Sequence, residues 1–228
     1  MLAKVLDANL DLAAADLPRE YFYQSLPLCV LDAVFSIGIR YKQVENLVNR
    51  YCRHFNLRVY RDHGAPYQSV QEQEPISKFI SRVESLGPQA FAQTVLENRT
   101  RTSAVNGILK ADAALRFAHV LRRFDVDCFQ DVASVLRDDS FVGAIKAIPG
   151  QGSGLSLSYF RMLCGDEDLA KPDRHVLAFL AGHLGYAATP QDAQRLLEEA
   201  TAKLRQRYPD LTLRKLDYAI WNYQRARR

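Results

Sequence analysis

Ile148-Pro149-Gly150-Gln151-Gly152-Ser153-Gly154 separates two segments with helical periodicity. On the N-terminal side, residues 138–148 carry apolar side chains at i, i+4 and i+7, namely Phe141, Ile145 and Ile148. Pro149 and Gly150 cannot easily continue a helix, so they end the first one. A second helix is predicted to begin near Ser153, with an inner face of Leu155, Tyr159 and Met162. The pattern therefore predicts a helix–hairpin–helix.

This hairpin has the features of an anion site. Glycines reach backbone angles closed to other residues and let another molecule approach the main chain closely. The new helix presents unpaired N–H groups and the positive end of its dipole, which suits a phosphate. Such a contact would position DNA without reading its sequence. The alternative, a tight helix–helix turn without any ligand, stays open on this segment alone.

The rest of the chain also shows helical periodicity and no strong strand alternation, so we predict an all-α fold. Helical spacing is clear around Leu28–Phe35 and Val44–Tyr51, and residues 57–76 are predicted to form a loop with a short extended piece at 57–60. Further helices are predicted at about 76–86, 88–98, 105–123, 128–136, 173–184, 190–207 and 212–226.

Composition narrows the class of protein. The 228 residues are 48% hydrophobic and 25% charged, which is typical of a globular protein, and the net charge is +4. Basic residues gather in 99–123 and 203–228, which favours a polyanionic partner over two merely solvated helix faces. No apolar run is long enough for a membrane span. Four scattered cysteines form no metal or redox motif, so we expect reduced thiols in the cytoplasm.

Asp173 follows Pro172 at a predicted helix start. An N-cap is the common use of Asp at such a position. A functional role is compatible with capping, because the cap fixes the carboxylate and the helix dipole favours its ionised form.

The hairpin together with Lys171-Pro172-Asp173-Arg174-His175-Val176 resembles the helix-hairpin-helix DNA glycosylase superfamily over roughly residues 26–185. The segment Asn98–Lys110 is similar to the one that precedes the hairpin in that family. The resemblance implies a two-lobed helical fold with a DNA-binding cleft between the lobes. One lobe would span 26–150, and residues 1–25 with 151–228 would form the other.

The resemblance also assigns chemistry. Asp173 would be the catalytic carboxylate, and residues Pro149, Gly150, Gln151, Gly152, Ser153 and Gly154 would bind a DNA phosphate. Members that also cleave the strand carry a lysine where this chain has Gly154, and neither Lys146 nor Lys171 matches that position. We therefore expect hydrolysis by water without lyase activity. No cysteine follows Cys164, so an iron–sulfur cluster near the C-terminus is excluded, and the one ion left open is a monovalent cation on the hairpin backbone.

An enzyme of this type must extrude the base from the duplex. By loose alignment, the candidates for a duplex wedge or other DNA contact are Arg40, Tyr41, Arg99 and Arg101. The alternative for Arg40 and Tyr41 is a surface helix end. For Arg99 and Arg101 it is simple contact with phosphate. The pocket for the extruded base could be lined by Tyr21, Phe22, Tyr23 and Phe35. Core packing is the more ordinary use of each of them, as it is for Trp221. We interpret His175 as a phosphate or structural partner, because it does not share a helix face with Asp173.

Residues 27–38 and 216–221 are most similar to a bacterial branch of small glycosylases, some of which resemble anti-phage enzymes that remove hypermodified bases such as glucosylated hydroxymethylcytosine. The resemblance thus implies a monomeric glycosylase that removes a modified base from double-stranded DNA, with phage DNA as the source we name. The alternatives are a repair glycosylase for alkylated or damaged bases, a non-catalytic DNA-binding module, and a helical protein-interaction domain.

Overall fold

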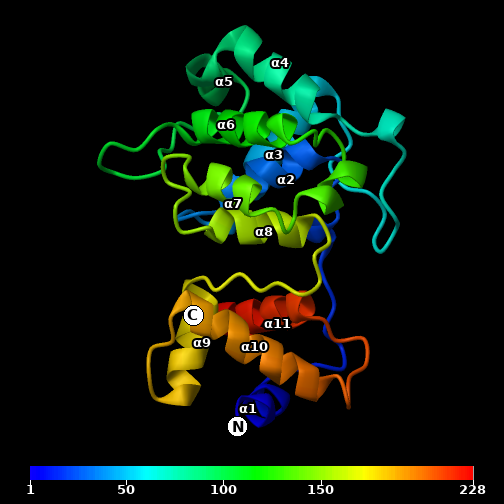
Figure 1. Ribbon diagram of the computed structural model, residues 1–228, viewed down its shortest axis with the longest axis vertical. Coiled ribbons are helices and arrows are strands. Elements are labelled where there is room, and N and C mark those ends of the chain that lie inside the picture. The colour runs from blue at the N-terminus through cyan, green and yellow to red at the C-terminus, as the bar shows by residue number, and fades with distance from the viewer. Residues whose placement is uncertain (228) are drawn as a thin grey trace. The chain divides into compact units, whose positions relative to one another are not determined.

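A computed structural model describes residues 1–227 of the chain. Across these residues the fold is all-helical, with eleven α-helices, three 3₁₀-helices and no strand, as the sequence predicts (Figure 1). Two isolated β-bridges, Tyr23 to Tyr60 and Arg101 to Leu109, join loop segments. The chain divides into two compact units, residues 19–164 and residues 1–18 with 165–228. No helix of the described part is long and apolar enough to cross a membrane.

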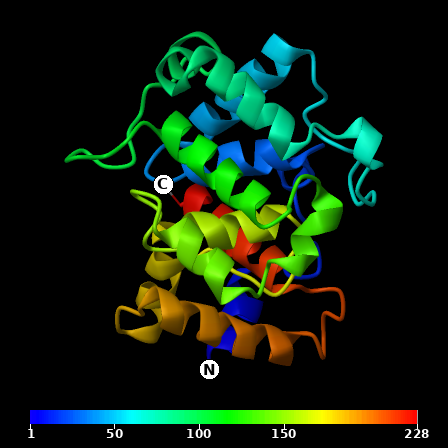
Figure 2. The ribbon, with the colours of Figure 1, turned by 45° about the horizontal axis from the view of Figure 1, so that its top comes forward.

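The larger unit is built around helix α2, Leu26–Phe35, in which every residue is buried. Helices α3, α4, α6 and α8 all pack against it (Figures 1 and 2). A helix buried on all sides sits in the middle of a core, and its neighbours need only one apolar face each. The helices of this unit are α2, α3 (Tyr41–Phe55), α4 (Ile76–Leu86), α5 (Pro88–Thr94), α6 (Lys110–Arg123), α7 (Asp139–Lys146) and α8 (Leu155–Leu163), with 3₁₀-helices at Arg19–Tyr21, Val70–Glu72 and Phe129–Ser134.

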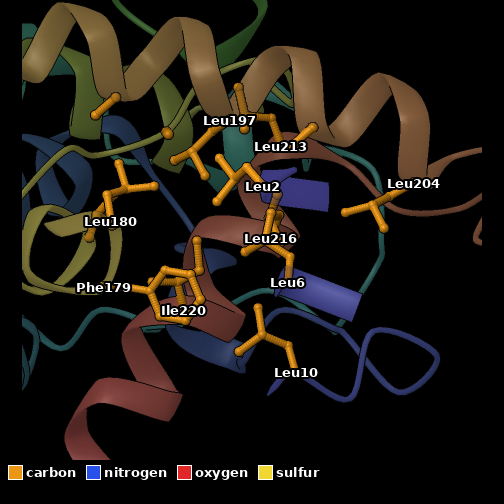
Figure 3. Close-up of a cluster of buried hydrophobic side chains, with 14 of the residues drawn as sticks. Leu2, Leu6, Leu10, Phe179, Leu180, Leu197, Leu204, Leu213, Leu216 and Ile220 are labelled. Atoms are coloured by element: carbon orange, nitrogen blue, oxygen red, sulfur yellow. The ribbon is translucent and has the colours of Figure 1, made fainter. Parts of the chain in front are cut away.

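The smaller unit joins both ends of the chain around a core of its own. Its helices are α1 (Leu2–Asn9), α9 (Arg174–Leu184), α10 (Pro190–Leu204) and α11 (Leu213–Ala226). Leu6, Phe179, Leu216 and Ile220 are fully buried and meet at its centre (Figure 3). Burial of each such side chain contributes roughly 1.5–3 kcal/mol, so the apolar faces of the four helices hold the unit together.

The boundaries of the units differ from the predicted lobe limits. The larger unit extends beyond 26–150 at both ends, so it contains the complete hairpin and all of α8. The hairpin and the two helices that it joins therefore belong to a single unit. Within this unit α7 and α8 also contact each other.

Several predicted helices were wrong in extent. The helix predicted at 88–98 ends at Thr94, and the one predicted from 105 begins only at Lys110 because residues 100–110 pair with themselves. The helix predicted at 128–136 is a short 3₁₀-helix, and α10 ends at Leu204 where 207 was expected. Helix α1 was not predicted, although Leu2, Leu6 and Leu10 bury one face of it.

Candidate functional site

The hairpin closes on itself through its own backbone. The Gln151 amide donates to the Ile148 carbonyl and the Gly154 amide to the Gln151 carbonyl, both at 2.9 Å. Gly150 and Gly154 have φ angles of +86° and +74°, which favour glycine. Gln151 is buried and its side-chain oxygen accepts a hydrogen bond from the Ser156 hydroxyl. The turn is thus held in shape without a ligand.

The outer side of the hairpin offers N–H groups. Gly152 and Ser153 are exposed, and within residues 1–227 their amides make no hydrogen bond. Gly154 is the N-cap of α8, so the positive end of this helix's dipole lies at the same turn. This geometry can receive an oxyanion from solvent.

Two other segments pack closely on the hairpin glycines. A Cβ on Gly150 would collide with the side chain of Thr102. A Cβ on Gly154 would lie 2.8 Å from Cε of Lys146 and 3.6 Å from its Nζ. Glycine is therefore required at position 150 by contact as well as by backbone angle. The Lys146 ammonium thus lies beside Gly154.

The four arginine and tyrosine candidates have different surroundings. Arg40 is exposed and is the N-cap residue of α3, whereas the Tyr41 hydroxyl is buried, with burial and then Asp32 raising the pKa of Tyr41 far above its ordinary value. Arg99 is exposed. Arg101 donates from Nη1 to the Gly107 carbonyl at 2.7 Å. Of these four side chains, Arg40 and Arg99 are exposed and make no hydrogen bond within the described residues. The Tyr41 hydroxyl is buried, and Arg101 is bonded to Gly107.

Asp173 is the N-cap of α9, as predicted. Its Oδ1 accepts hydrogen bonds from the amides of His175 at 2.7 Å and Val176 at 3.2 Å. Both cap bonds use the same oxygen, so Oδ2 makes no hydrogen bond to the described residues. The side chain is half-buried. A fixed carboxylate with one unengaged oxygen can stabilise a cation or accept a proton.

The loop in front of Asp173 is fastened to the smaller unit at three points. Glu167 forms an ion pair with buried Arg214 at 2.8 Å, and the Ala170 amide donates to Gln194 at 3.0 Å. The Lys171 amide donates to Oδ1 of Asp217 at 2.8 Å. Because the loop is tied down before Pro172, the position of Asp173 does not depend on the cap alone.

Asp217 is a second carboxylic acid near Asp173 that the sequence analysis did not single out as a site residue. It is buried on α11. Burial raises the pKa of the Asp217 carboxyl to about 8, and the Asp173 carboxylate adds to the rise, while the Lys171 hydrogen bond opposes it. Asp217 is thus protonated near neutral pH.

Aromatic residues of α11 lie close to the start of α9. The Trp221 ring contacts His175 edge-on at 6.2 Å and stacks on Tyr218 at 5.8 Å, and the Arg225 guanidinium lies 4.3 Å from its centre. The prediction that Trp221 packs in the core was wrong, because it is half-buried and the core side of α11 carries Leu216 and Ile220. It forms a partly exposed aromatic surface instead.

The larger unit contains a carboxylate that sequence reasoning missed. Asp32 is fully buried on α2, and its Oδ2 accepts hydrogen bonds from the hydroxyls of Tyr23 at 2.9 Å and Tyr159 at 3.3 Å. Burial, followed by the charge of Asp32, raises the pKa of both tyrosines well above the ordinary value. A lone Asp in an otherwise apolar helix was the available signal, since such a residue must find donors.

The predicted aromatic walls are core residues here. Tyr21, Phe22, Tyr23 and Phe35 are all buried, as their more ordinary interpretation expects. Tyr23 stacks on Tyr60 at 5.4 Å, and Tyr21 contacts the edge of Tyr159 at 6.3 Å.

Within residues 1–227 no three His, Cys, Asp or Glu side chains gather as metal ligands, and the four cysteines are free and buried. A monovalent cation would use hairpin carbonyls. Those of Ile148 and Gln151 already accept one hydrogen bond each, and each keeps a second lone pair. The donor set is compatible with such an ion, which stays a proposal.

Residues 1–225 match the model of a family described as "Domain of unknown function (DUF8548)". The chain belongs to this family. No curated protein matches this chain. A solved structure, the 8-oxoguanine glycosylase/lyase of Methanocaldococcus jannaschii in complex with a 15mer DNA containing 8-oxoguanine, is similar at a TM-score of 0.45 and 17% identity, covering 99% of this chain and 91% of that one. Likeness at this level establishes no shared activity.

Proposed function

We propose that this DUF8548 protein is a monofunctional DNA glycosylase that uses Asp173 to hydrolyse the N-glycosidic bond of an extruded base. The observation that carries the proposal is the cap of α9, which engages Oδ1 of Asp173 and leaves Oδ2 without a hydrogen bond to the described residues. The hairpin supports it, because exposed amides at Gly152 and Ser153 suit a DNA phosphate. Double-stranded DNA is the proposed partner of a monomeric chain.

The reaction follows from the charge of its transition state. As the C1′–N bond breaks, its electron pair leaves with the base and positive charge grows on the sugar. The Asp173 carboxylate stabilises that charge. A water oxygen then bonds to C1′, and its proton passes to Oδ2 of Asp173 or to solvent. The products are a free base and an abasic site.

Hydrolysis without strand cleavage is inferred from Gly154. A Schiff base needs an amine that attacks C1′, and the position used for it in related enzymes has no side chain here. The Lys146 ammonium beside Gly154 is better suited to a phosphate than to this attack, because it belongs to the last turn of α7, next to the hairpin amides.

For the substrate we propose a hypermodified cytosine of phage DNA, such as glucosylated hydroxymethylcytosine. The support is the similarity of residues 27–38 and 216–221 to enzymes of that kind. An alkylated or otherwise damaged base is the competing choice, and the two are separated by testing both substrates.

The experiment exposes phage DNA carrying glucosylated hydroxymethylcytosine, alkylated DNA and unmodified DNA to the protein, then cleaves abasic sites with alkali. We expect alkali-labile sites in one modified DNA with the wild type and none with Asp173→Asn. Asn keeps the capping acceptor, so α9 remains capped while the charge is lost.

Asp138→Asn is the matched control. Asp138 caps α7 in the same way, accepting from the amides of Ser140 at 2.7 Å and Phe141 at 3.1 Å. The control variant should form abasic sites at the wild-type rate. Absence of abasic sites in every DNA with the wild type would refute the proposed activity.

A further inference from the structure

Residues 98–110 form a projecting loop, which we call the finger (Figures 1 and 2). Its two sides pair: the Thr102 amide donates to the Ile108 carbonyl and the Lys110 amide to the Thr100 carbonyl, both at 2.9 Å. Arg101 ties the far side by donating to the Gly107 carbonyl. The turn is tight, because a Cβ on Gly107 would collide with the Ser103 backbone. These bonds make the finger stiff.

The base of the finger is anchored on both sides. The Lys110 ammonium is buried and donates to the Phe35 carbonyl at 3.0 Å, at the C-terminal end of α2. On the other side Thr102 packs directly on Gly150 of the hairpin. The finger and the hairpin therefore form one rigid surface of the larger unit.

The tip of the finger is exposed and carries one large apolar side chain, that of Val105. Residues 103–106 are all exposed, and Val105 keeps 78% of its surface in solvent. Single exposed apolar residues are common and need no explanation by themselves. Val105 differs in that a loop with paired sides holds it out, and the base of this loop packs on Gly150 of the hairpin.

We propose that Val105 is the residue that inserts into the base stack and fills the space left by the extruded base. This inference rests on the proposed function. An apolar side chain between base steps is a common way to unstack a duplex, and the hairpin would hold the backbone while the tip enters. Arg101, a wedge candidate by sequence, instead positions the finger through Gly107, and Arg99 is left to contact phosphate.

The test needs no substrate base. A duplex with a tetrahydrofuran abasic analogue has the vacant space already, so a protein with an inserting side chain binds it more tightly than the intact duplex. We expect the wild type to prefer the analogue duplex, and Val105→Ser to lower that preference about tenfold, through loss of apolar contact. Val105→Leu should keep it.

Val70→Ser is the matched control, because Val70 is also an exposed valine of the larger unit, at 51%. It should leave the preference unchanged, and both serine variants should unfold at the wild-type temperature. An unchanged preference in Val105→Ser, or no preference in the wild type, overturns the assignment of Val105 while base release by the enzyme is unaffected. Absence of any salt-dependent DNA binding would overturn both this inference and the proposed function.

Discussion

Two residues before Asp173, the backbone amide of Lys171 donates a 2.8 Å hydrogen bond to the buried carboxyl of Asp217. This bond joins the loop that leads into α9 to helix α11. The bond fixes the loop to a helix two residues before the proposed catalytic carboxylate, Asp173. Asp217 is therefore a positioning residue for Asp173.

Asp217→Asn should change the pH dependence of stability. The folded carboxyl keeps its proton up to about pH 8, whereas an unfolded Asp releases it near pH ~3.9. The folded state of the wild type binds the extra proton, so stability falls as pH rises between these values, by up to about 1.4 kcal/mol per pH unit. Asn resembles the protonated form and still accepts from Lys171, so we expect a flatter profile.

Thermal unfolding of wild type and Asp217→Asn at pH 5 and pH 8 measures this difference. The variant should become progressively more stable relative to the wild type as the pH is raised from 5 to 8. Equal pH slopes in the two proteins would mean that Asp217 is not protonated in the folded state at neutral pH.

Gly150→Ala should destabilise the larger unit. The new Cβ meets Thr102 and the residue keeps a φ of +86°, and the backbone term alone costs about 1–2 kcal/mol. A double-mutant cycle with Thr102→Gly removes the collision but not the backbone term. Chemical denaturation should show a coupling of about 1 kcal/mol between the sites. Additive effects would show that the finger does not pack on the hairpin.

Lys110→Met should lower the free energy of unfolding by about 1–3 kcal/mol, because the carbonyls of Phe35 and Ile37 lose a charged donor. Burial lowers the pKa of Lys110 to about 8, so the loss should be measured at pH 7, where most of the ammonium is charged. Lys203→Met, at an exposed position of α10, is the control and should change stability by less than about 0.5 kcal/mol. A similar loss in both variants would argue against the anchor.

Borohydride should trap no covalent complex between the protein and a DNA substrate. The reason is Gly154, which supplies no amine. If an adduct forms, the amine nearest that position is Lys146, so its loss in Lys146→Gln would identify the nucleophile and replace hydrolysis by a lyase mechanism.

The sequence predicted those features that depend on local signals. Proline and glycine ended α7, and apolar spacing gave its buried face of Phe141 and Ile145. The cap at Asp173 was predictable because a helix start favours Asp. The finger was not predicted. Residues 105–109 were expected to begin a helix, whereas the structure pairs the Thr102 amide with the Ile108 carbonyl.

The missing parts of the site share one cause. Asp217 lies in the amphipathic helix α11 and Asp32 in the apolar helix α2, and neither helix by itself identifies the partner of its acid. Their roles depend on donors far along the chain, Lys171 for the first and Tyr159 for the second. Spacing within a helix carries no information about such partners. Trp221 was misplaced for the same reason, because its neighbour His175 comes from another helix.

The most direct test of the account is mass-spectrometric detection of a free base released from modified DNA. We expect a base to appear with the wild type and with Asp138→Asn, and to be absent with Asp173→Asn, while the strand stays intact until alkali is added. Release of the base by Asp173→Asn at the wild-type rate would contradict the role of Asp173.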